Sequence, residues 1–530
     1  MIKEVRLCLG FILLTLSLFA EDQAQDAGTI YLEGRKLAFG EGCQIDMIRA
    51  KELYRKAADL GDPRALAWKA RSIYRGNRGF SKDEVEARRI FQEIEPQLRE
   101  MGLNKQPDAL GSLCRTLATI EPKTRGQEAF ELAKKNAIDG KPSDWDTMGW
   151  FFQDGIGVLK DEKEAVKWYT KAAEQGDATA QSNLGWCYAY GKGVAKDGKQ
   201  AVKWYTKSAE QGDAVGQRLL GWCYDTGNGV VQDYKEAVRW YTKAAEQGDA
   251  TAQSNLGWCY ANGVGIAKDE KKAVKWYTKA AEQGNAAGQQ HLGWCYANGK
   301  GVVKDEKEAM KWYTKSAEQG DADGQRLLGW CYENGKGVAK NEKEAVKWYL
   351  KAAEKKQVWP MGQLARMYEE GRGTDKNPTE AFRWWNQQAE AGDFWAPENV
   401  ARCHANGIGT PKNPEEATKW YGKVRAKLEE ETKKNEAWPW DNLGRFYFNG
   451  LGVEKDYAKA LECYHKAADL KSGWSMEQIG WCYENGKGVA KDEKEAVKWY
   501  QKAAEKKQTW SMGALGLTIL QIGSQQVITH

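Results

Sequence analysis

"ATAQSNLGWCYANGVGIAKDEKKAVKWYTKAAEQG", at residues 250–284, predicts two helices joined by a glycine-rich loop. Asp249 stands directly before this stretch, and its carboxylate is suited to accept a hydrogen bond from a free backbone N–H at the helix start. Ala252, Leu256 and Cys259 follow at i, i+4 and i+7, a spacing that places them on one helical face. The first helix is therefore expected to bury a face that contains several small residues.

The second half of the stretch predicts a second helix of the same length. Gly263 is expected to end the first helix in the left-handed region, and the loop "GVGIAK" follows. Asp269 is suited to cap the second helix, in which Ala273 and Tyr277 begin an apolar stripe. Gly284 ends that helix. The stretch is a helix–turn–helix unit.

An acidic cap followed three residues later by glutamate occurs in related stretches, as in Asp161 with Glu164. This spacing is close to a capping box, in which the two side chains each bond to the other residue's backbone N–H. The sequence therefore predicts a reciprocal cap at the start of these second helices.

The unit recurs with a period of thirty-six residues. The glycine of "LGWCY" is the marker of the period, and its equivalents are Gly149, Gly185, Gly221, Gly257, Gly293, Gly329, Ala365 and Ala401. An insertion then moves the next markers to Gly444, Gly480 and Gly516, and weaker copies stand at Gly34, Ala70 and Gly111. A helix pair cannot bury its own apolar face, so neighbouring units must stack on it. The prediction is an all-α protein, a right-handed α/α solenoid superhelix of about thirteen repeats.

The period divides the chain into segments. The predicted divisions are a signal peptide at 1–20, diverged repeats at 27–148, regular repeats at 149–426, an insertion at 427–437, C-terminal repeats at 438–520 and a tail at 521–530. Lys3 and Arg6 precede an apolar run of thirteen residues, which is typical of a cleaved secretory signal. The alternative is an uncleaved membrane anchor. After this run, no segment is expected to cross a membrane.

The motif A-x-x-x-LG-x-x-Y-x-x-G-x-GV-x-K-D-x-x-x-A-x-x-WY-x-KAAE-x-G resembles the Sel1-like repeat family over nearly all of the mature chain. The related tetratricopeptide repeat is similar in fold, but it usually has thirty-four residues and lacks the G-x-GV-x-K-D loop. The resemblance implies an adaptor or scaffold that holds partners in a superhelical groove. It implies no reaction.

Six cysteines share the position after the tryptophan of "GWCY", and they could be metal ligands, disulfide partners, core residues or part of a binding surface. Cys259 is expected to point inward. Its equivalents in adjacent repeats should lie about 9–10 Å apart, which is too far for a disulfide, whose Cα atoms lie within about 7 Å. No histidine is near enough to complete a metal site. The interpretation is a small core residue.

One branch of the Sel1-like family is cysteine-rich, with two cysteines that clip each helix pair together and a penicillin-related activity linked to it. This chain has one cysteine per repeat and no partner about eight residues away. The resemblance to that branch therefore supports neither the disulfides nor the hydrolase activity.

Tryptophans occupy two positions of the repeat. Those of the second helix flank its apolar stripe and are predicted to pack between repeats: Trp168, Trp204, Trp240, Trp276, Trp312, Trp348, Trp384, Trp420 and Trp499. Those of the first helix lie about 145° from the apolar centre, at ~100° per residue, and are predicted to face outward into the groove: Trp150, Trp186, Trp222, Trp258, Trp294, Trp330 and Trp481. Arg218 and Arg326 lie one turn earlier on the same face, and Arg366 and Arg402 replace the tryptophan in two repeats.

Outward tryptophans with arginine neighbours are typical of the centre of a binding interface. The eleven residues of this face are the predicted binding site, suited to an extended peptide, a partner helix or a glycan chain. The alternative is that the rings stack on one another along the superhelix and only stiffen it.

Composition and motifs narrow the function further. The chain carries 79 basic and 74 acidic residues, a net charge of +5, which gives no concentrated basic face for nucleic acid. Four scattered histidines and the lack of any nucleophile or phosphate-loop motif give no catalytic, metal or cofactor site. The prediction is a non-enzymatic adaptor, periplasmic or secreted, that binds a protein or peptide. A glycan- or peptidoglycan-binding module is the alternative, and a hydrolase comes third.

Overall fold

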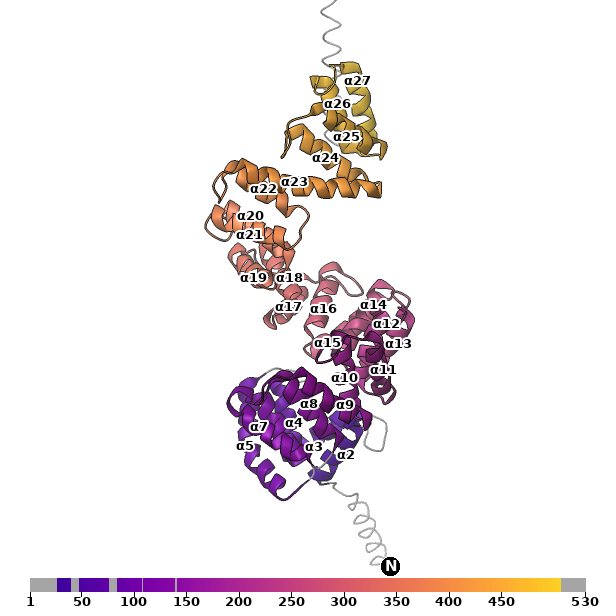
Figure 1. The fold of residues 1–530 in the computed structure, drawn as a ribbon, viewed down its shortest axis with the longest axis vertical. Coiled ribbons are helices and arrows are strands. Elements are labelled where there is room, and N and C mark those ends of the chain that lie inside the picture. The colour runs from indigo at the N-terminus through magenta and orange to yellow at the C-terminus, as the bar shows by residue number, and fades with distance from the viewer. Residues whose placement is uncertain (1–25, 40–46, 76–82, 107, 139–140, 507–530) are drawn as a thin grey trace, which may run out of the picture. The chain divides into compact units, whose positions relative to one another are not determined.

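The computed structural model describes residues 26–39, 47–75, 83–106, 108–138 and 141–506. Within these ranges the chain is α-helical, with one 3₁₀ turn and no strand. The predicted signal peptide and tail, and the last marker Gly516, lie outside them. The chain forms two compact units that divide after Gly324, and each is described by itself (Figure 1).

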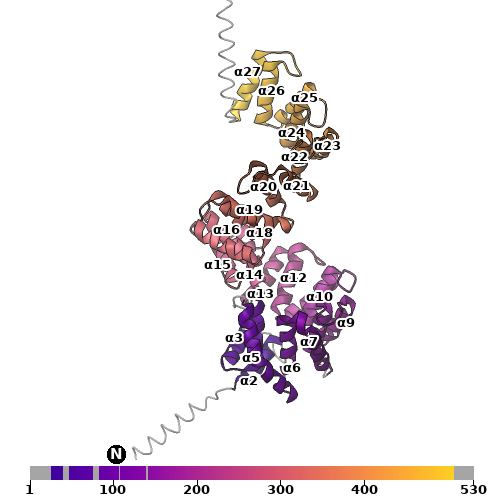
Figure 2. The same ribbon diagram turned by 90° about the vertical axis from the view of Figure 1, so that its left-hand side faces the viewer.

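The helices form thirteen consecutive pairs within the described residues, which confirms the predicted solenoid of about thirteen helix-turn-helix repeats (Figure 2). The first helices of the pairs, here the A helices, are α2 (Ala27–Phe39), α4 (Pro63–Arg75), α6 (Ala109–Ile120), α8 (Pro142–Asp154), α10 (Ala178–Tyr190), α12 (Ala214–Thr226), α14 (Ala250–Asn262), α16 (Ala286–Asn298), α18 (Ala322–Asn334), α20 (Val358–Glu370), α22 (Ala396–Asn406), α24 (Ala437–Asn449) and α26 (Gly473–Asn485). The second helices, here the B helices, are α3 (Met47–Asp59), α5 (Glu84–Leu103), α7 (Pro122–Ala137), α9 (Glu162–Glu174), α11 (Gly198–Glu210), α13 (Tyr234–Glu246), α15 (Glu270–Glu282), α17 (Glu306–Glu318), α19 (Glu342–Glu354), α21 (Pro378–Glu390), α23 (Pro414–Glu431), α25 (Tyr457–Asp469) and α27 (Glu493–Glu505).

The ends of α14 and α15 lie where the sequence predicts them. The Asp249 carboxylate accepts the backbone N–H of Ala252 at 2.7 Å, and Gly263 ends α14 with φ 71°. The Asp269 carboxylate accepts the N–H of Lys272 at 2.9 Å. Side-chain caps and left-handed glycines thus define each thirteen-residue helix.

The predicted reciprocal capping box is wrong in its second half. The Asp161 carboxylate does accept the N–H of Glu164 at 3.0 Å. However, the N–H of Asp161 donates to the carbonyl of Phe152 in the preceding helix at 2.9 Å, and the Glu164 carboxylate binds Lys167 instead. The loop between the two helices is closed by that backbone bond, so the cap needs no return bond from the glutamate.

The marker glycine is required by a tyrosine of the B helix. A Cβ atom added to Gly257 would lie 2.7 Å from the ring of Tyr277, which is almost completely buried. The same contact recurs in other repeats, as between Gly185 and Tyr205. The glycine therefore lets the two helices of a pair approach until the ring rests on the A-helix backbone.

The second glycine of the loop has a different role. Gly265 has φ 69°, and an added Cβ would lie 2.1 Å from the backbone carbonyl oxygen of Tyr234, at the start of α13 in the preceding repeat. The loop thus packs directly on its neighbour's backbone. The G-x-G spacing encodes a contact between repeats as well as the end of a helix.

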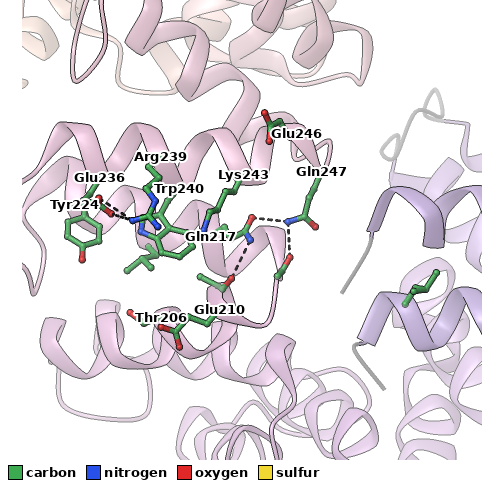
Figure 3. Close-up of a pocket in the computed structure, with 14 residues that line it drawn as sticks. Thr206, Glu210, Gln217, Tyr224, Glu236, Arg239, Trp240, Lys243, Glu246 and Gln247 are labelled. Atoms are coloured by element: carbon green, nitrogen blue, oxygen red, sulfur yellow. Dashed lines mark hydrogen bonds and ion pairs between the residues drawn. The ribbon is translucent and has the colours of Figure 1, made fainter. Parts of the chain in front are cut away.

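Glutamine side chains link the two helices of a repeat and bind that repeat to the one before it, which forms a hydrogen-bonded ladder in the first unit. The Gln247 amide donates to the Gln217 side-chain oxygen at 2.8 Å, and the Gln217 amide donates to the carbonyl of Ala209 at 3.3 Å (Figure 3). Equivalent bonds of 2.7 Å run from Gln211 to Gln181, from Gln283 to Gln253 and from Gln319 to Gln289. The amide N–H of each A-helix glutamine is thus bound by the preceding repeat, and its oxygen is bound by the glutamine that ends the B helix of its own repeat.

The cysteines of the described residues are free and buried. Burial raises the pKa of the Cys259 and Cys223 thiols to about 12. The inward orientation predicted for Cys259 is confirmed, and it packs with Leu256 in the core of its repeat. These thiols are small core side chains.

The predicted insertion coincides with a longer B helix. α23 has eighteen residues where α21 has thirteen, and a 3₁₀ turn, η1 (Thr432–Lys434), follows it. Val424 and Leu428 are buried along the extended face. The extra residues thus add helix and a turn before the next repeat.

Candidate binding surface

The tryptophans of the B helices are packed between helices and covered by cations. Trp204, Trp312 and Trp384 are buried, and the others of this set are half-buried. A lysine three residues later lies over most of these rings. The Lys243 Nζ atom, for example, lies 4.1 Å from the ring centroid of Trp240 (Figure 3). Both residues line a hollow of about 1030 Å³. This arrangement agrees with the predicted packing role.

The tryptophans of the A helices are more exposed. Trp258, Trp294 and Trp330 are 41%, 44% and 36% exposed. Trp150, Trp186, Trp222 and Trp481 are half-buried. The predicted outward orientation is confirmed for the three most exposed rings, which occupy equivalent positions in consecutive repeats.

Stacking along the row occurs at one place. Tyr190 lies 5.3 Å from Trp186 and stacks on Trp222 with centroids 6.1 Å apart and planes 18° apart. In the part of the chain that the structure describes, neither Trp258 nor Trp294 makes a ring contact. The alternative of a continuous stack therefore applies to Trp186, Tyr190 and Trp222 and not to the exposed rings.

Of the four predicted arginines, Arg366 is exposed, and the other three lie near a carboxylate or an aromatic ring. Arg218 lies 3.3 Å from the carboxylate of Asp249. Arg402 binds Glu369 through two hydrogen bonds, of 2.7 and 2.8 Å. Arg326 lies 6.0 Å from the ring centroid of a tryptophan that the predicted site omits, Trp359.

Two exposed tryptophans of the second unit were missed by the sequence analysis. Trp359 and Trp395 are 41% and 37% exposed, and they stand seven residues before Arg366 and Arg402. Residues seven apart on a helix share a face. An aromatic residue at that position, where regular repeats have threonine, valine, alanine or aspartate, is the signal that could have identified them.

These side chains surround a groove in the second unit. It has a volume of about 650 Å³ between α20, α21 and α22, and Trp359, Arg366, Gln388, Trp395 and Arg402 are among its lining residues. We call it the α20–α22 groove. The structure thus brings together two of the predicted arginines with two tryptophans that were not predicted.

A second hollow, of about 470 Å³, lies in the first unit and is lined by the diverged repeats and their neighbours. Arg71 and Arg115 line it from α4 and α6, and Asp146 and Asp213 line it from the region of α8 to α12. Tyr31 of α2 also contributes. Basic and acidic groups from several repeats therefore line one chamber.

The acidic side of this chamber carries closely spaced carboxyls. Burial raises the pKa of Asp146, and the neighbouring Asp177 carboxylate adds to the effect. Burial also raises the pKa of Asp213, although that side chain accepts hydrogen bonds from the Gly216 N–H and the hydroxyl of Ser208. Since the pKa of Asp146 is raised to about 8, the protonated form of Asp146 is favoured near neutral pH.

We expect acidification from pH 8 to pH 5.5 to stabilise the first unit through Asp146. A folded-state pKa raised above the unfolded value contributes stability that is present at low pH and is lost as pH rises through the folded pKa. Asp146→Asn should therefore raise the stability at pH 8 by about 1 kcal/mol or more and reduce the pH dependence. Urea midpoints from hydrogen exchange in α8–α12 would measure this difference.

The matched control is Asp233→Asn, an exposed helix cap at which asparagine can still cap. The partly buried His291 has a pKa lowered by burial and opposes the effect in this pH range, so the difference between variant and wild type is the relevant quantity. A pH dependence unchanged by Asp146→Asn would contradict the assignment.

Among the residues that the structure describes, no group of three histidine, cysteine, aspartate or glutamate side chains is arranged to hold a metal ion. No helix in the same part of the chain has the length and apolar character needed to span a bilayer.

Comparison with known proteins gives one sequence family. The sequence profile of the Sel1 repeat matches residues 29–62, 148–177, 178–213, 214–249, 250–285, 286–321, 322–356, 361–393, 398–423, 442–472 and 475–507. The unmatched α4 to α7 are still two helix pairs. No curated protein sequence matches the chain.

Three solved structures are similar to this chain, and the first of them gives the same indication. A protective antigen of uropathogenic Escherichia coli with an SLR fold is 30% identical, covers 90% of this chain and 92% of its own, and has a TM-score of 0.56. A Sel1 repeat protein from Oxalobacter formigenes is 38% identical over 44% of this chain and 95% of its own, with a TM-score of 0.42. The cysteine-rich protein B of Helicobacter pylori is 34% identical over 25% of this chain and 96% of its own, with a TM-score of 0.22.

Proposed function

Because the chain belongs to the Sel1 repeat family, whose repeats form scaffolds that generally mediate protein interactions, we propose that it is a non-enzymatic adaptor that binds a protein or peptide partner on its A-helix face. The observation that carries this proposal is the exposure of Trp258 and Trp294 at equivalent positions of consecutive repeats. Large aromatic side chains left exposed in a row indicate an interaction surface.

The contrast with the B helices supports this interpretation. There the tryptophans are buried or half-buried and lie under lysines of their own helix, as Trp276 lies under Lys279 at 4.3 Å. The exposed A-helix tryptophans have no such cover in the described structure. Exposed aromatic area of this kind is what a partner's apolar side chains would bury.

The test is capture of partners from the cell envelope by the mature chain. A Trp222→Ala, Trp258→Ala, Trp294→Ala variant should retain less than about a tenth of the captured protein, since truncation of an interface tryptophan commonly costs about 2 kcal/mol or more. Equal capture by this variant and the wild type would remove the A-helix face from the proposal.

A control variant removes exposed apolar side chains elsewhere. This variant changes three highly exposed loop residues, with the substitutions Leu159→Ala, Val231→Ala and Val303→Ala. It should capture as much partner protein as the wild type. Adding soluble peptidoglycan fragments tests the glycan alternative. Loss of capture in their presence would favour a carbohydrate over a protein as the ligand of this face.

We also infer export to the periplasm or the cell exterior. The support is the basic start and apolar run of residues 1–20. The mass of the chain isolated from native cells tests this inference, because cleavage after Ala20 leaves a chain that begins at Glu21. A full-length mass would support the alternative of an uncleaved anchor.

A further inference from the structure

The α20–α22 groove differs from its counterparts in the other repeats. Trp359 stands where regular repeats have a small or polar residue such as Thr251, and Gln388 stands where they have alanine or serine, such as Ala352. Arg366 replaces the row's tryptophan. Several departures from the repeat pattern therefore converge on one hollow.

Three arginines of the second unit share the position of Arg366, and two of them are neutralised. Arg402 binds Glu369 with hydrogen bonds of 2.7 and 2.8 Å, and Arg445 binds Glu398 with bonds of the same lengths. Among the residues that the structure describes, the guanidinium of Arg366 has no hydrogen bond or ion pair. Arg366 is exposed at the groove.

Arg402 pairs with Glu369, which stands four residues after the marker of the preceding repeat. By the same spacing, the carboxylate that would pair with Arg366 is Glu333. Glu333 is already bound to other side chains. The carboxylate of Glu333 accepts hydrogen bonds from Tyr349 at 2.7 Å and Arg372 at 3.1 Å. The charge of Arg366 is thus left for an external group.

The other carboxylates of the groove are also engaged. Glu370 binds Arg372 at 2.5 Å, and Asp393 accepts the backbone N–H groups of Trp395 at 2.8 Å and Ala396 at 2.7 Å. Arg366 is therefore the charged side chain of this groove that remains uncommitted in the described structure. A carboxylate can accept two parallel hydrogen bonds from such a guanidinium.

A buried acceptor lies in the same groove. Gln388 is 8% exposed, and its side-chain oxygen accepts no hydrogen bond from the described residues. The amide lies over Gly362, where an added Cβ would be 2.9 Å from that oxygen. An unpaired buried acceptor is costly, and the backbone N–H of a bound peptide would satisfy it.

Two exposed rings complete the groove. Trp359 and Trp395 offer apolar area to a ligand's side chains. Together, a free guanidinium, an unpaired carbonyl oxygen and two indole rings match a peptide with an acidic side chain, an available backbone N–H and apolar neighbours. A neutral glycan would leave the guanidinium without a counter-charge.

We propose that the α20–α22 groove binds an extended peptide segment through an internal acidic side chain that pairs with Arg366. This proposal rests on the proposed adaptor function and specifies the chemistry of its ligand. Gln388 accepts a backbone N–H of the segment, and Trp359 and Trp395 contact apolar side chains that flank the acidic residue.

The test is selection of random dodecapeptides, displayed with their C-termini blocked, on the full mature chain. The wild-type pool should be enriched in aspartate or glutamate beside apolar residues. The selected peptides should bind Arg366→Ala at least tenfold more weakly, and their Asp→Asn or Glu→Gln versions should lose affinity for the wild type to a similar extent. Selection on Arg366→Glu should instead enrich lysine or arginine.

Arg383→Ala is the matched control, because it removes the same charge from the exposed B-helix face of the same repeat and should leave binding unchanged. Selected peptides that bind Arg366→Ala as well as the wild type would overturn the carboxylate assignment and leave the adaptor function standing. A wild-type pool without acidic enrichment would also overturn it. Loss of partner capture on the Trp222, Trp258 and Trp294 substitutions remains a separate test of the adaptor function.

Discussion

Replacing Gly265 by alanine is expected to destabilise the first unit by more than about 2 kcal/mol. The new Cβ would lie 2.1 Å from the carbonyl oxygen of Tyr234, closer than real Cβ contacts, and that oxygen belongs to the backbone of α13. The loop or the start of α13 must therefore move. The left-handed φ of 69° adds strain of its own.

The control is Gly176→Ala, which separates collision from strain. Gly176 has φ 88°, and a Cβ there meets nothing within 4 Å. Its substitution should cost about 1 kcal/mol, the ordinary penalty for a left-handed alanine. Urea unfolding followed by hydrogen exchange would measure both variants, and equal losses at the two positions would contradict the proposed contact between repeats.

Tyr277→Ala is expected to cost about 3–5 kcal/mol, as for other large-to-small changes of buried aromatic residues. The ring is 3% exposed and rests on Gly257, so its removal leaves a cavity between α14 and α15. Because each repeat contacts mainly its neighbours, a weak repeat in the middle of an array separates the parts on either side. The unfolding transition of the first unit should broaden or split.

Tyr277→Phe is the matched variant and should change stability by less than about 0.5 kcal/mol. The hydroxyl of Tyr241 in the preceding repeat donates to Asp225 at 3.2 Å, but the residue equivalent to Asp225 beside Tyr277 is Ala261. Calorimetry of the three proteins would measure these effects. A phenylalanine variant as unstable as the alanine variant would show that the ring's volume is not what stabilises this pair.

The sequence predicted the repeat and its helix ends because those depend on neighbouring residues. Asp249, Gly263 and Asp269 act within a few positions along the chain, so their roles follow from spacing alone. The contact of Gly265 with Tyr234 depends on how one repeat stacks on the next, and the spacing explains it only as a helix end. The second half of the capping box failed for a similar reason, since the N–H it required is bound to the preceding helix.

The candidate site was predictable in position and not in detail. Helical angles alone placed Trp258 and Trp294 outward. Arg366 and Arg402 look equivalent in the sequence, and only the ion pair of Arg402 with Glu369 distinguishes them. Trp359 does not follow from the position of the "GWCY" tryptophan, because the aromatic side chain stands seven residues upstream where arginine replaces that tryptophan.

Because the glutamine ladder repeats the same hydrogen bonds in successive repeats, the number of repeats can change without loss of these bonds. Each junction uses the same amide N–H and the same backbone carbonyl, as in Gln217 to Ala209 and Gln253 to Ala245, so excision or duplication of one thirty-six-residue period rejoins identical partners. Recombination between nearly identical coding segments would then lengthen or shorten the array while it keeps this bond at the new junction.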